Sequence, residues 1–236
     1  SEPRTGLFLI GMPTFSPDQD GVKAYRALFD TLRGRRGDLM KARAVVIDLR
    51  HNNGGSSSWS REAARAMWGK EAFDTRIGDY FRDVRIWWRA SEGNHAYMAD
   101  LETKLRADGN VEVADFIRET AAGMKTALAS GEPYFVEDKD APPAVRTRAP
   151  TDFVTPVYVI TPGRCASACL DAVDAFTRFP NVTLIGAPTS GDSTYMEVRT
   201  QELPSGRGRL VIPNKMWVGR PRGAGVVYGP HIVMDD

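Results

Sequence analysis

The feature that most constrains the fold is a strand, a glycine loop and a helix that follow one another directly. The strand is Ala44–Leu49, a continuous and largely β-branched run (AVVIDL). A run without polar alternation is typical of a strand buried on both faces of a mostly parallel sheet. The loop at residues 52–55 reads NNGG, and apolar residues then recur with helical spacing at 63–68. These segments predict one α/β unit, in which ligands bind beyond the carboxyl end of the strand.

A second unit of the same kind is predicted later in the chain. Pro156–Thr161 (PVYVIT) has the pattern of another buried strand, and a helix is expected from about Ala166 to Arg178. Further strands are predicted at residues 5–11, 85–89 and 182–185 and within the tail at 225–236, and a further helix from residue 21 to about 34. The pattern therefore predicts an α/β fold with a central, largely parallel sheet and flanking helices.

Two segments depart from this alternation. Residues 92–130 carry two helical patterns separated by the turn ADGN, which predicts a helical hairpin inserted into the domain. Tyr195–Glu202 and Gly208–Ile212, joined through LPSG, predict a C-terminal β-hairpin. The proline-containing stretch at 131–152 is expected to be a loop or linker. The length fits one large domain or two small ones, and we expect a single domain, residues 1–236, that carries both additions.

Charge and composition exclude several classes of function. Lys and Arg number 31 against 30 Asp and Glu, which gives a net charge of +1. A charge this small provides no general attraction to nucleic acid or to an anionic membrane. No apolar run approaches the roughly 18 residues that a membrane span needs. The two cysteines and three dispersed histidines lack metal-binding spacing, so no metal or other cofactor is expected. Because the chain begins at Ser1 rather than Met, we expect a mature product or a fragment that has lost any export signal.

The loops that follow the two buried strands carry residues suited to chemistry. Gly54 and Gly55 can direct backbone N–H groups towards one point, which suits an oxyanion, although a tight turn without a ligand explains the same residues. Ser167 stands among small residues at the start of the predicted helix. Its hydroxyl would lie there beside helix N-terminal N–H groups, which favour a developing negative charge. Serine is also a common helix N-cap, so a purely structural role remains open.

Cys165 and Cys169 flank this serine. We expect them to pack as two small side chains beneath Ser167, and the alternative is a reactive thiol at the helix start. A disulfide between them would require non-helical geometry. Asp171 follows one helical turn after the serine and could either orient a base or face water.

Three segments together resemble the C-terminal-processing, or tail-specific, serine peptidases. Asp48–Gly55 (DLRHNNGG) is similar to the DLRxNxGG element of that family, and Arg164–Cys169 (RCASAC) to its small-residue nucleophile motif. Gly186–Asp192 (GAPTSGD) is similar to its GxPTxG loop. Each motif is weak alone, but their order and spacing agree over most of the chain. The regulatory PDZ module of the family is not recognisable.

The resemblance implies a role for each matching residue. Ser167 takes the position of the nucleophile, and the N–H groups of Ala168 and of Gly54 or Gly55 take the positions of oxyanion-hole donors. Asp192 stands where the peptidases with a Ser-Lys dyad carry lysine. A carboxylate with an ordinary pKa of about 4 is a weaker base at neutral pH than a neutral amine. The dyad is therefore absent from this sequence.

A replacement base could come from a histidine, as in tricorn-type relatives. His51 lies within the glycine loop, and His231 lies in a terminal segment that could pack beside the loop at 186–192. His95 and Lys215 are further candidates. Asp192 could instead orient a histidine, as carboxylates do in catalytic triads.

The resemblance thus implies a serine hydrolase that cleaves peptide bonds through an acyl-enzyme, with a peptide or protein as substrate. The alternative is a catalytically impaired module of the same fold that binds a peptide or an apolar ligand. The resemblance also implies an exported protein, periplasmic or secreted. The sequence leaves the individual substrate and the oligomeric state open.

Overall fold

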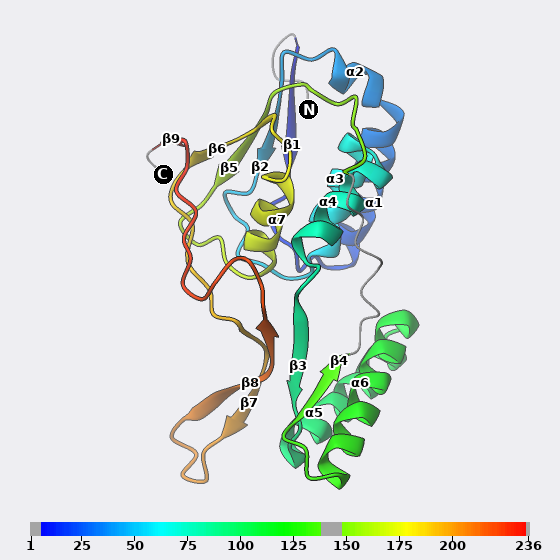
Figure 1. Cartoon of the computed structure of the whole chain (residues 1–236), viewed down its shortest axis with the longest axis vertical. Coiled ribbons are helices and arrows are strands. Elements are labelled where there is room, and N and C mark those ends of the chain that lie inside the picture. Colours follow the sequence, from blue (N-terminus) through cyan, green and yellow to red (C-terminus); the bar gives the residue numbers. More distant parts are fainter. Residues whose placement is uncertain (1–5, 138–147, 235–236) are drawn as a thin grey trace. The chain divides into compact units, whose positions relative to one another are not determined.

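The computed structural model describes residues 6–137 and 148–234 and divides the chain into two compact units (Figure 1). The first unit comprises Ser1–Phe81, Pro143–Asp192 and Arg222–Asp236. The second comprises Arg82–Pro142 and Ser193–Pro221. Each unit has a sheet and a hydrophobic core of its own.

The first unit contains a parallel sheet in the order β1-β2-β5-β6-β9. Its strands are β1 (Leu7–Gly11), β2 (Ala44–Asp48), β5 (Val157–Thr161), β6 (Val182–Gly186) and β9 (Ile232–Val233). The register places Gly11 beside Asp48, and Thr161 beside Gly186. The carboxyl ends of β1, β2, β5 and β6 therefore lie along one edge of the sheet. This arrangement confirms the predicted α/β class with a largely parallel sheet.

Helices of the first unit pack against this sheet (Figure 1). They are α1 (Gln19–Gly34), α2 (Arg36–Met40), α3 (Ser58–Trp68), α4 (Lys70–Tyr80) and α7 (Ala168–Phe176). The side chain of Asp18 caps α1 by accepting the Gly21 N–H at 2.8 Å. Within the core, the Trp68 ring stacks on Phe179 with ring centroids 4.4 Å apart.

Burial of β2 differs from the sequence expectation of a strand buried on both faces. Val45 and Ile47 are fully buried, whereas Val46 and Asp48 are only half-buried. Successive side chains of a strand point to opposite faces. One face of β2 is thus covered by the helices and the other is partly exposed, so the continuous β-branched run overstated the burial.

The second unit contains an antiparallel sheet in the order β4-β3-β8-β7. Its strands are β3 (Arg85–Arg89), β4 (Tyr134–Glu137), β7 (Tyr195–Glu202) and β8 (Arg209–Val218). The helices α5 (Glu92–Ala107) and α6 (Val111–Ala129) confirm the predicted helical hairpin, and β7 with β8 confirms the β-hairpin. Strand β4 corrects the expectation of a loop or linker at 131–152, because Tyr134–Glu137 pairs with β3.

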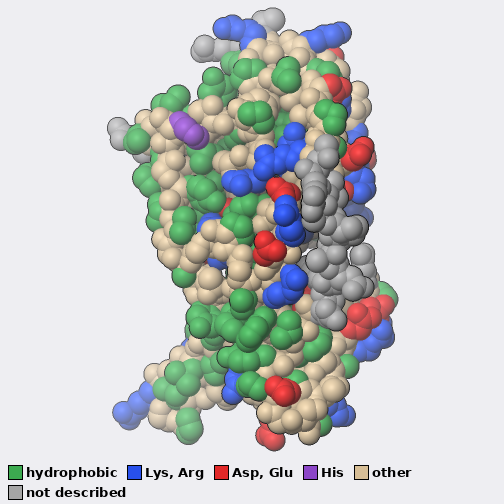
Figure 2. All heavy atoms as spheres, viewed as in Figure 1, with side chains coloured by type: hydrophobic (Ala, Val, Ile, Leu, Met, Phe, Trp, Pro, Cys, Tyr) green, Lys and Arg blue, Asp and Glu red, His purple; other side chains and the backbone are tan. Residues whose placement is uncertain are grey.

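Charged side chains of both signs are interspersed on the face drawn in Figure 2. This mixture agrees with the net charge of +1. Within the described ranges, none of the helices combines the length and the apolar character needed to cross a membrane. The same residues hold no cluster of three or more His, Cys, Asp or Glu side chains arranged for a metal ion.

Candidate active site

Ser167 occupies the turn between β5 and α7 in an unusual backbone conformation. Its φ of 53° and ψ of −126° place it in the left-handed half of the map, where a non-glycine residue costs of order 1–3 kcal/mol. Ser167 and Glu197 are the two non-glycine residues with positive φ in the described part of the chain. The Ser167 side chain makes no capping hydrogen bond to α7, so helix capping does not explain the serine. A strained serine on a strand-to-helix turn has the geometry of a nucleophile elbow.

The glycine loop after β2 lies directly against this turn. A Cβ atom on Gly54 would lie 2.9 Å from the Ala166 carbonyl oxygen and 3.0 Å from the Ser167 Cβ. A Cβ atom on Gly55 would lie 2.1 Å from the Phe15 carbonyl oxygen. Both glycines also have positive φ, of 118° and 129° respectively. Each glycine therefore permits a different close approach, and Gly54 is the one that brings the loop to the serine.

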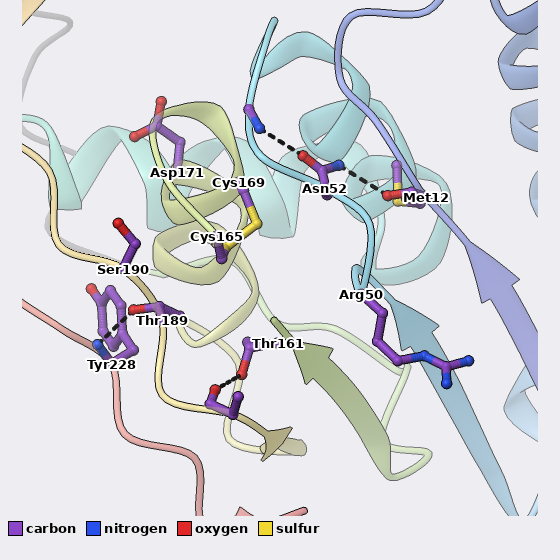
Figure 3. Close-up of a disulfide and its surroundings, with 12 residues drawn as sticks. Met12, Arg50, Asn52, Thr161, Cys165, Cys169, Asp171, Thr189, Ser190 and Tyr228 are labelled. Atoms are coloured by element: carbon purple, nitrogen blue, oxygen red, sulfur yellow. Dashed lines mark hydrogen bonds between the residues drawn. A yellow bond between two sulfur atoms is a disulfide. The ribbon is translucent and has the colours of Figure 1, made fainter. Parts of the chain in front are cut away.

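Asn52, which the sequence analysis left without a role, fixes the shape of this loop (Figure 3). Its side chain is fully buried. Its Oδ1 accepts the Gly54 N–H at 2.9 Å, and its Nδ2 donates to the Met12 carbonyl at 2.9 Å. The N–H of Gly54 is thus already engaged. Asn52 is the asparagine of the DLRxNxGG pattern, so that motif contained the signal.

Ala168 provides a second backbone donor beside the serine. It is the first residue of α7, and the first N–H groups of a helix have no intrahelical partner. The positive end of the helix dipole favours negative charge at the same place. The structure thus brings together Ser167, Ala168 and the loop that contains Gly54 and Gly55.

Cys165 and Cys169 form a disulfide, with their Cα atoms 5.2 Å apart (Figure 3). The expectation of two unbonded side chains, or of a reactive thiol, is therefore wrong. The physical reason is the start of α7 at Ala168 rather than at about Ala166, which leaves Cys165 in the preceding turn. The pair thus has the non-helical geometry that the bond requires.

Asp192 is bound by Arg222, a residue that sequence reasoning missed. The side chain of Arg222 is fully buried, and its Nη1 donates to the Asp192 carboxylate. The same guanidinium contacts Asp174 at 2.9 Å and Asp171 at 2.7 Å. These four residues are called the Arg222 cluster below. The position that carries lysine in Ser-Lys peptidases is therefore occupied here by a carboxylate paired with an arginine.

The other two carboxylates of the cluster are also tied into the fold. Asp171 accepts the Ser57 hydroxyl at 2.7 Å, and burial raises its pKa above the usual value, opposed by Ser57 and Arg222. Asp174 accepts the hydroxyls of Tyr80 and Tyr228. Burial, with a contribution from Asp174, raises the pKa of Tyr80 to about 12. Asp171 therefore points into the protein and does not face water.

The candidate bases lie in different surroundings. His51 is exposed in the turn after β2 and, with Arg50 and Arg164, lines a cavity of about 600 Å³. Arg50 also pairs with Asp48 at 2.8 Å and holds the pKa of that carboxyl below its usual range. The Nδ1 of His231 accepts the Leu184 N–H at 2.9 Å.

Two further candidates belong to the second unit. His95 lies on α5, and Lys215 lies on β8, where its Nζ is 3.1 Å from a Glu197 carboxylate oxygen. The Lys215 ammonium also lies 4.8 Å from the centre of the Trp88 ring. The Lys215 side chain is thus engaged by neighbours within that sheet.

Comparison with solved structures shows related folds. Mature CPAF has a TM-score of 0.52 and 14% identity, over 96% of this chain and 46% of that one. Mature CPAF complexed with lactacystin has a TM-score of 0.52 and 13% identity, over 96% of this chain and 47% of that one. The photosystem II D1 C-terminal processing protease has a TM-score of 0.40 and 13% identity, over 97% of this chain and 42% of that one. The chain thus spans less than half the length of these structures.

Sequence comparison identifies the family. No curated protein sequence matches the chain. The sequence profile of peptidase family S41, in contrast, matches residues 7–220, which include all three motifs and most of both units. The chain belongs to peptidase family S41.

Proposed function

We propose that the protein is a serine hydrolase that cleaves peptide bonds through an acyl-enzyme, with Ser167 as the nucleophile. The observation that carries this proposal is the strained conformation of Ser167, whose side chain makes no capping hydrogen bond and which faces a loop that only glycine permits. Strain of this kind persists where the surroundings impose it, and it clusters at functional sites. In the reaction, the Ser167 Oγ attacks the substrate carbonyl carbon and forms a tetrahedral intermediate.

The oxyanion of that intermediate is stabilised by two backbone donors. Ala168 supplies one N–H at the start of α7, where the helix dipole adds to the hydrogen bond. Gly55 supplies the other, because the Gly54 N–H is held by Asn52. Asn52 is therefore a positioning residue that fixes the orientation of the loop.

His51 is the proposed acceptor of the Ser167 proton. Arg222 holds Asp192 as one of three carboxylates around its guanidinium, and Leu184 already donates to the acceptor nitrogen of His231. His51, in contrast, is exposed at the same sheet edge as Ser167, and the nearby Asp48 carboxylate interacts electrostatically with it. The cavity beside His51 would then receive the part of the substrate next to the scissile bond.

A catalytically impaired binding module is the second candidate. The observation that favours it is the Arg222 cluster, since the guanidinium and Asp192 occupy the place of a dyad lysine. An arginine is not deprotonated in proteins and cannot act as a base. Under this alternative, the cavity lined by His51 and Arg164 would hold a peptide or an apolar ligand, and no bond would be cleaved.

A fluorophosphonate probe separates the two candidates. We expect wild-type protein and the matched variant Ser190→Ala to gain one covalent adduct in intact-mass spectra, because Ser190 is a neighbouring loop serine that hydrogen-bonds Gly191. Ser167→Ala should gain none while its melting temperature stays close to that of the wild type. Hydrolysis of a peptide library should also be lost in Ser167→Ala. A wild-type protein that binds peptides but takes up no probe would support the binding module instead.

We further propose that the protein works in an oxidising compartment, periplasmic or extracellular. The support is the Cys165–Cys169 disulfide, a bond that persists in exported proteins and is rare in the cytosol. Free-thiol titration under denaturing conditions tests the bond. Protein purified from its native compartment should show no reactive thiol, and two thiols per chain would contradict the proposal.

A further inference from the structure

We propose that the Cys165–Cys169 disulfide holds Ser167 in its reactive backbone conformation, so that both cysteines are positioning residues for the nucleophile. The proposal rests on the role assigned to Ser167 above. Its basis is the place of the serine in one short segment, whose disulfide is drawn in Figure 3. The bond joins residues four positions apart, and Ser167, with a φ of 53°, lies midway between them.

The two ends of the bond are anchored in different elements. Cys169 belongs to α7, and every residue of that helix except Asp171 is buried. Cys165 belongs to the turn after β5, where its N–H donates to the Pro162 carbonyl at 3.1 Å. Both cysteines are fully buried. The disulfide thus ties the strand-to-helix turn to the helix on either side of the serine.

The cross-link acts locally because it closes a very short loop. The stabilisation that a disulfide gives through the unfolded chain grows with the length of the loop it closes. A separation of four positions therefore contributes little of that effect, compared with a bond between distant segments. What the bond does restrict is the set of backbone dihedrals open to Ala166, Ser167 and Ala168.

Ser167 needs such a restraint. A positive φ is unfavourable for a residue with a Cβ atom, so an unrestrained serine would relax towards negative φ. That relaxation would rotate the Oγ atom and also turn the Ala168 N–H, because the two residues share a peptide unit. The nucleophile and one oxyanion donor would be misplaced together, and such displacements slow reactions that depend on near-attack geometry.

A packing role for the two sulfur atoms makes a different prediction. If the cysteines only filled space beneath the serine, replacing each would have an effect set by its own contacts, and the double variant would lose more than either single variant. If the bond is what matters, Cys165→Ala, Cys169→Ala and the double variant all lose the same restraint. The three should then show the same loss.

The experiment measures the second-order rate of fluorophosphonate labelling at Ser167, with kcat and KM on any peptide substrate that the wild type cleaves. We expect all three alanine variants to be labelled at least tenfold more slowly than the wild type, by a common factor. The value of kcat should fall by that factor while KM stays within twofold. Val173→Ala is the matched control, because Val173 is fully buried on the same helix but outside the cross-link. It should lose thermal stability and keep its labelling rate.

The outcomes are distinguishable. If the wild type itself takes up no probe, the proposed function fails. If the wild type is labelled and the alanine variants match it, or the double variant is slower than either single variant, the positioning role fails while the function stands. Should the variants not fold, wild-type protein treated with a phosphine until mass spectrometry shows two free thiols replaces them. Equal labelling of its reduced and oxidised forms would then overturn the proposal.

Discussion

Replacing Arg222 with glutamine tests how much the Arg222 cluster contributes to the stability of the fold. The guanidinium is fully buried and contacts Asp171, Asp174 and Asp192. Glutamine removes the positive charge and leaves three carboxylates facing one another, one of them fully buried. Breaking a buried ion pair by removing one partner costs about 3–5 kcal/mol, because the remaining charge has lost its compensation.

The expected loss is large enough to measure by heating. For a protein of 150–250 residues, 1 kcal/mol corresponds to about 2–4 °C in Tm, so the variant should melt about 6–20 °C below the wild type. Arg222→Lys should fall between the two, since an ammonium keeps the charge but cannot reach three carboxylates with a planar set of donors. Arg33→Gln is the matched control, because Arg33 pairs with Asp30 on the surface with both side chains more than half exposed. It should cost about 0.2–1 kcal/mol.

The stability lost in Arg222→Gln should also depend on pH, in a direction that follows from the pKa of Asp171. Burial already raises the pKa of Asp171 above its usual 3.8. A carboxyl with a raised folded pKa contributes its stability fully below the unfolded value, and that contribution is lost as pH rises through the folded value. Without Arg222, which opposes that shift, the pKa of Asp171 should rise further. The deficit of Arg222→Gln should therefore be greatest near pH 7 and shrink towards pH 4. Urea unfolding across this range checks it, and a deficit under 1 kcal/mol, or one constant with pH, would refute the reasoning.

Three further changes have defined outcomes. Gly54→Ala should slow probe labelling of Ser167 strongly, because the new Cβ atom would collide with Ala166 and Ser167. The control Gly109→Ala, also at positive φ but with open space around it, should leave the labelling rate unchanged. Equal labelling rates in the two variants would contradict the close approach of Gly54 to the serine. Asn52→Ala should lower stability by about 1–3 kcal/mol, because it frees the buried Gly54 N–H and Met12 carbonyl, and thermal unfolding measures this loss. Asp192→Lys should lower Tm and give no gain in ester hydrolysis, because the new ammonium would face the Arg222 guanidinium. Faster ester hydrolysis by this variant would contradict that role of Arg222.

The predictable parts of the fold were those that a local pattern encodes. The β-branched runs that became β2 and β5 marked the central strands, and the 3.6-residue periodicity marked the hairpin of α5 and α6. The two candidate loops come together because β2 and β5 are parallel neighbours, with Asp48 beside Ile160. Once a parallel sheet was predicted, the meeting of the glycine loop with the serine turn followed from the position of their strands.

Other parts depend on contacts that no local pattern contains. Helix α4 was missed because it follows α3 after the single residue Gly69, at a φ of 92°, and has only weak amphipathic character. Strand β4 is four residues long in a proline-containing stretch, and it forms only because β3 is available to pair with it. Prediction of the disulfide depended on whether α7 begins at residue 166 or at residue 168. A shift of this size lies within the ordinary uncertainty of helix ends.

The Arg222 cluster shows why a motif can match while its chemistry changes. The lysine of a Ser-Lys dyad is useful because its neutral amine can accept a proton, whereas an arginine stays protonated and a carboxylate is a weaker base than an amine. Asp192 and Arg222 restore a charge pair at the site without restoring the base. The cluster can therefore set the shape of the loop that follows β6, while proton transfer must depend on another segment. His51 lies on the loop that contacts the serine turn through Gly54. Under the proposed function, substitutions of His51 should accordingly lower any activity, whereas substitutions in the cluster should lower stability.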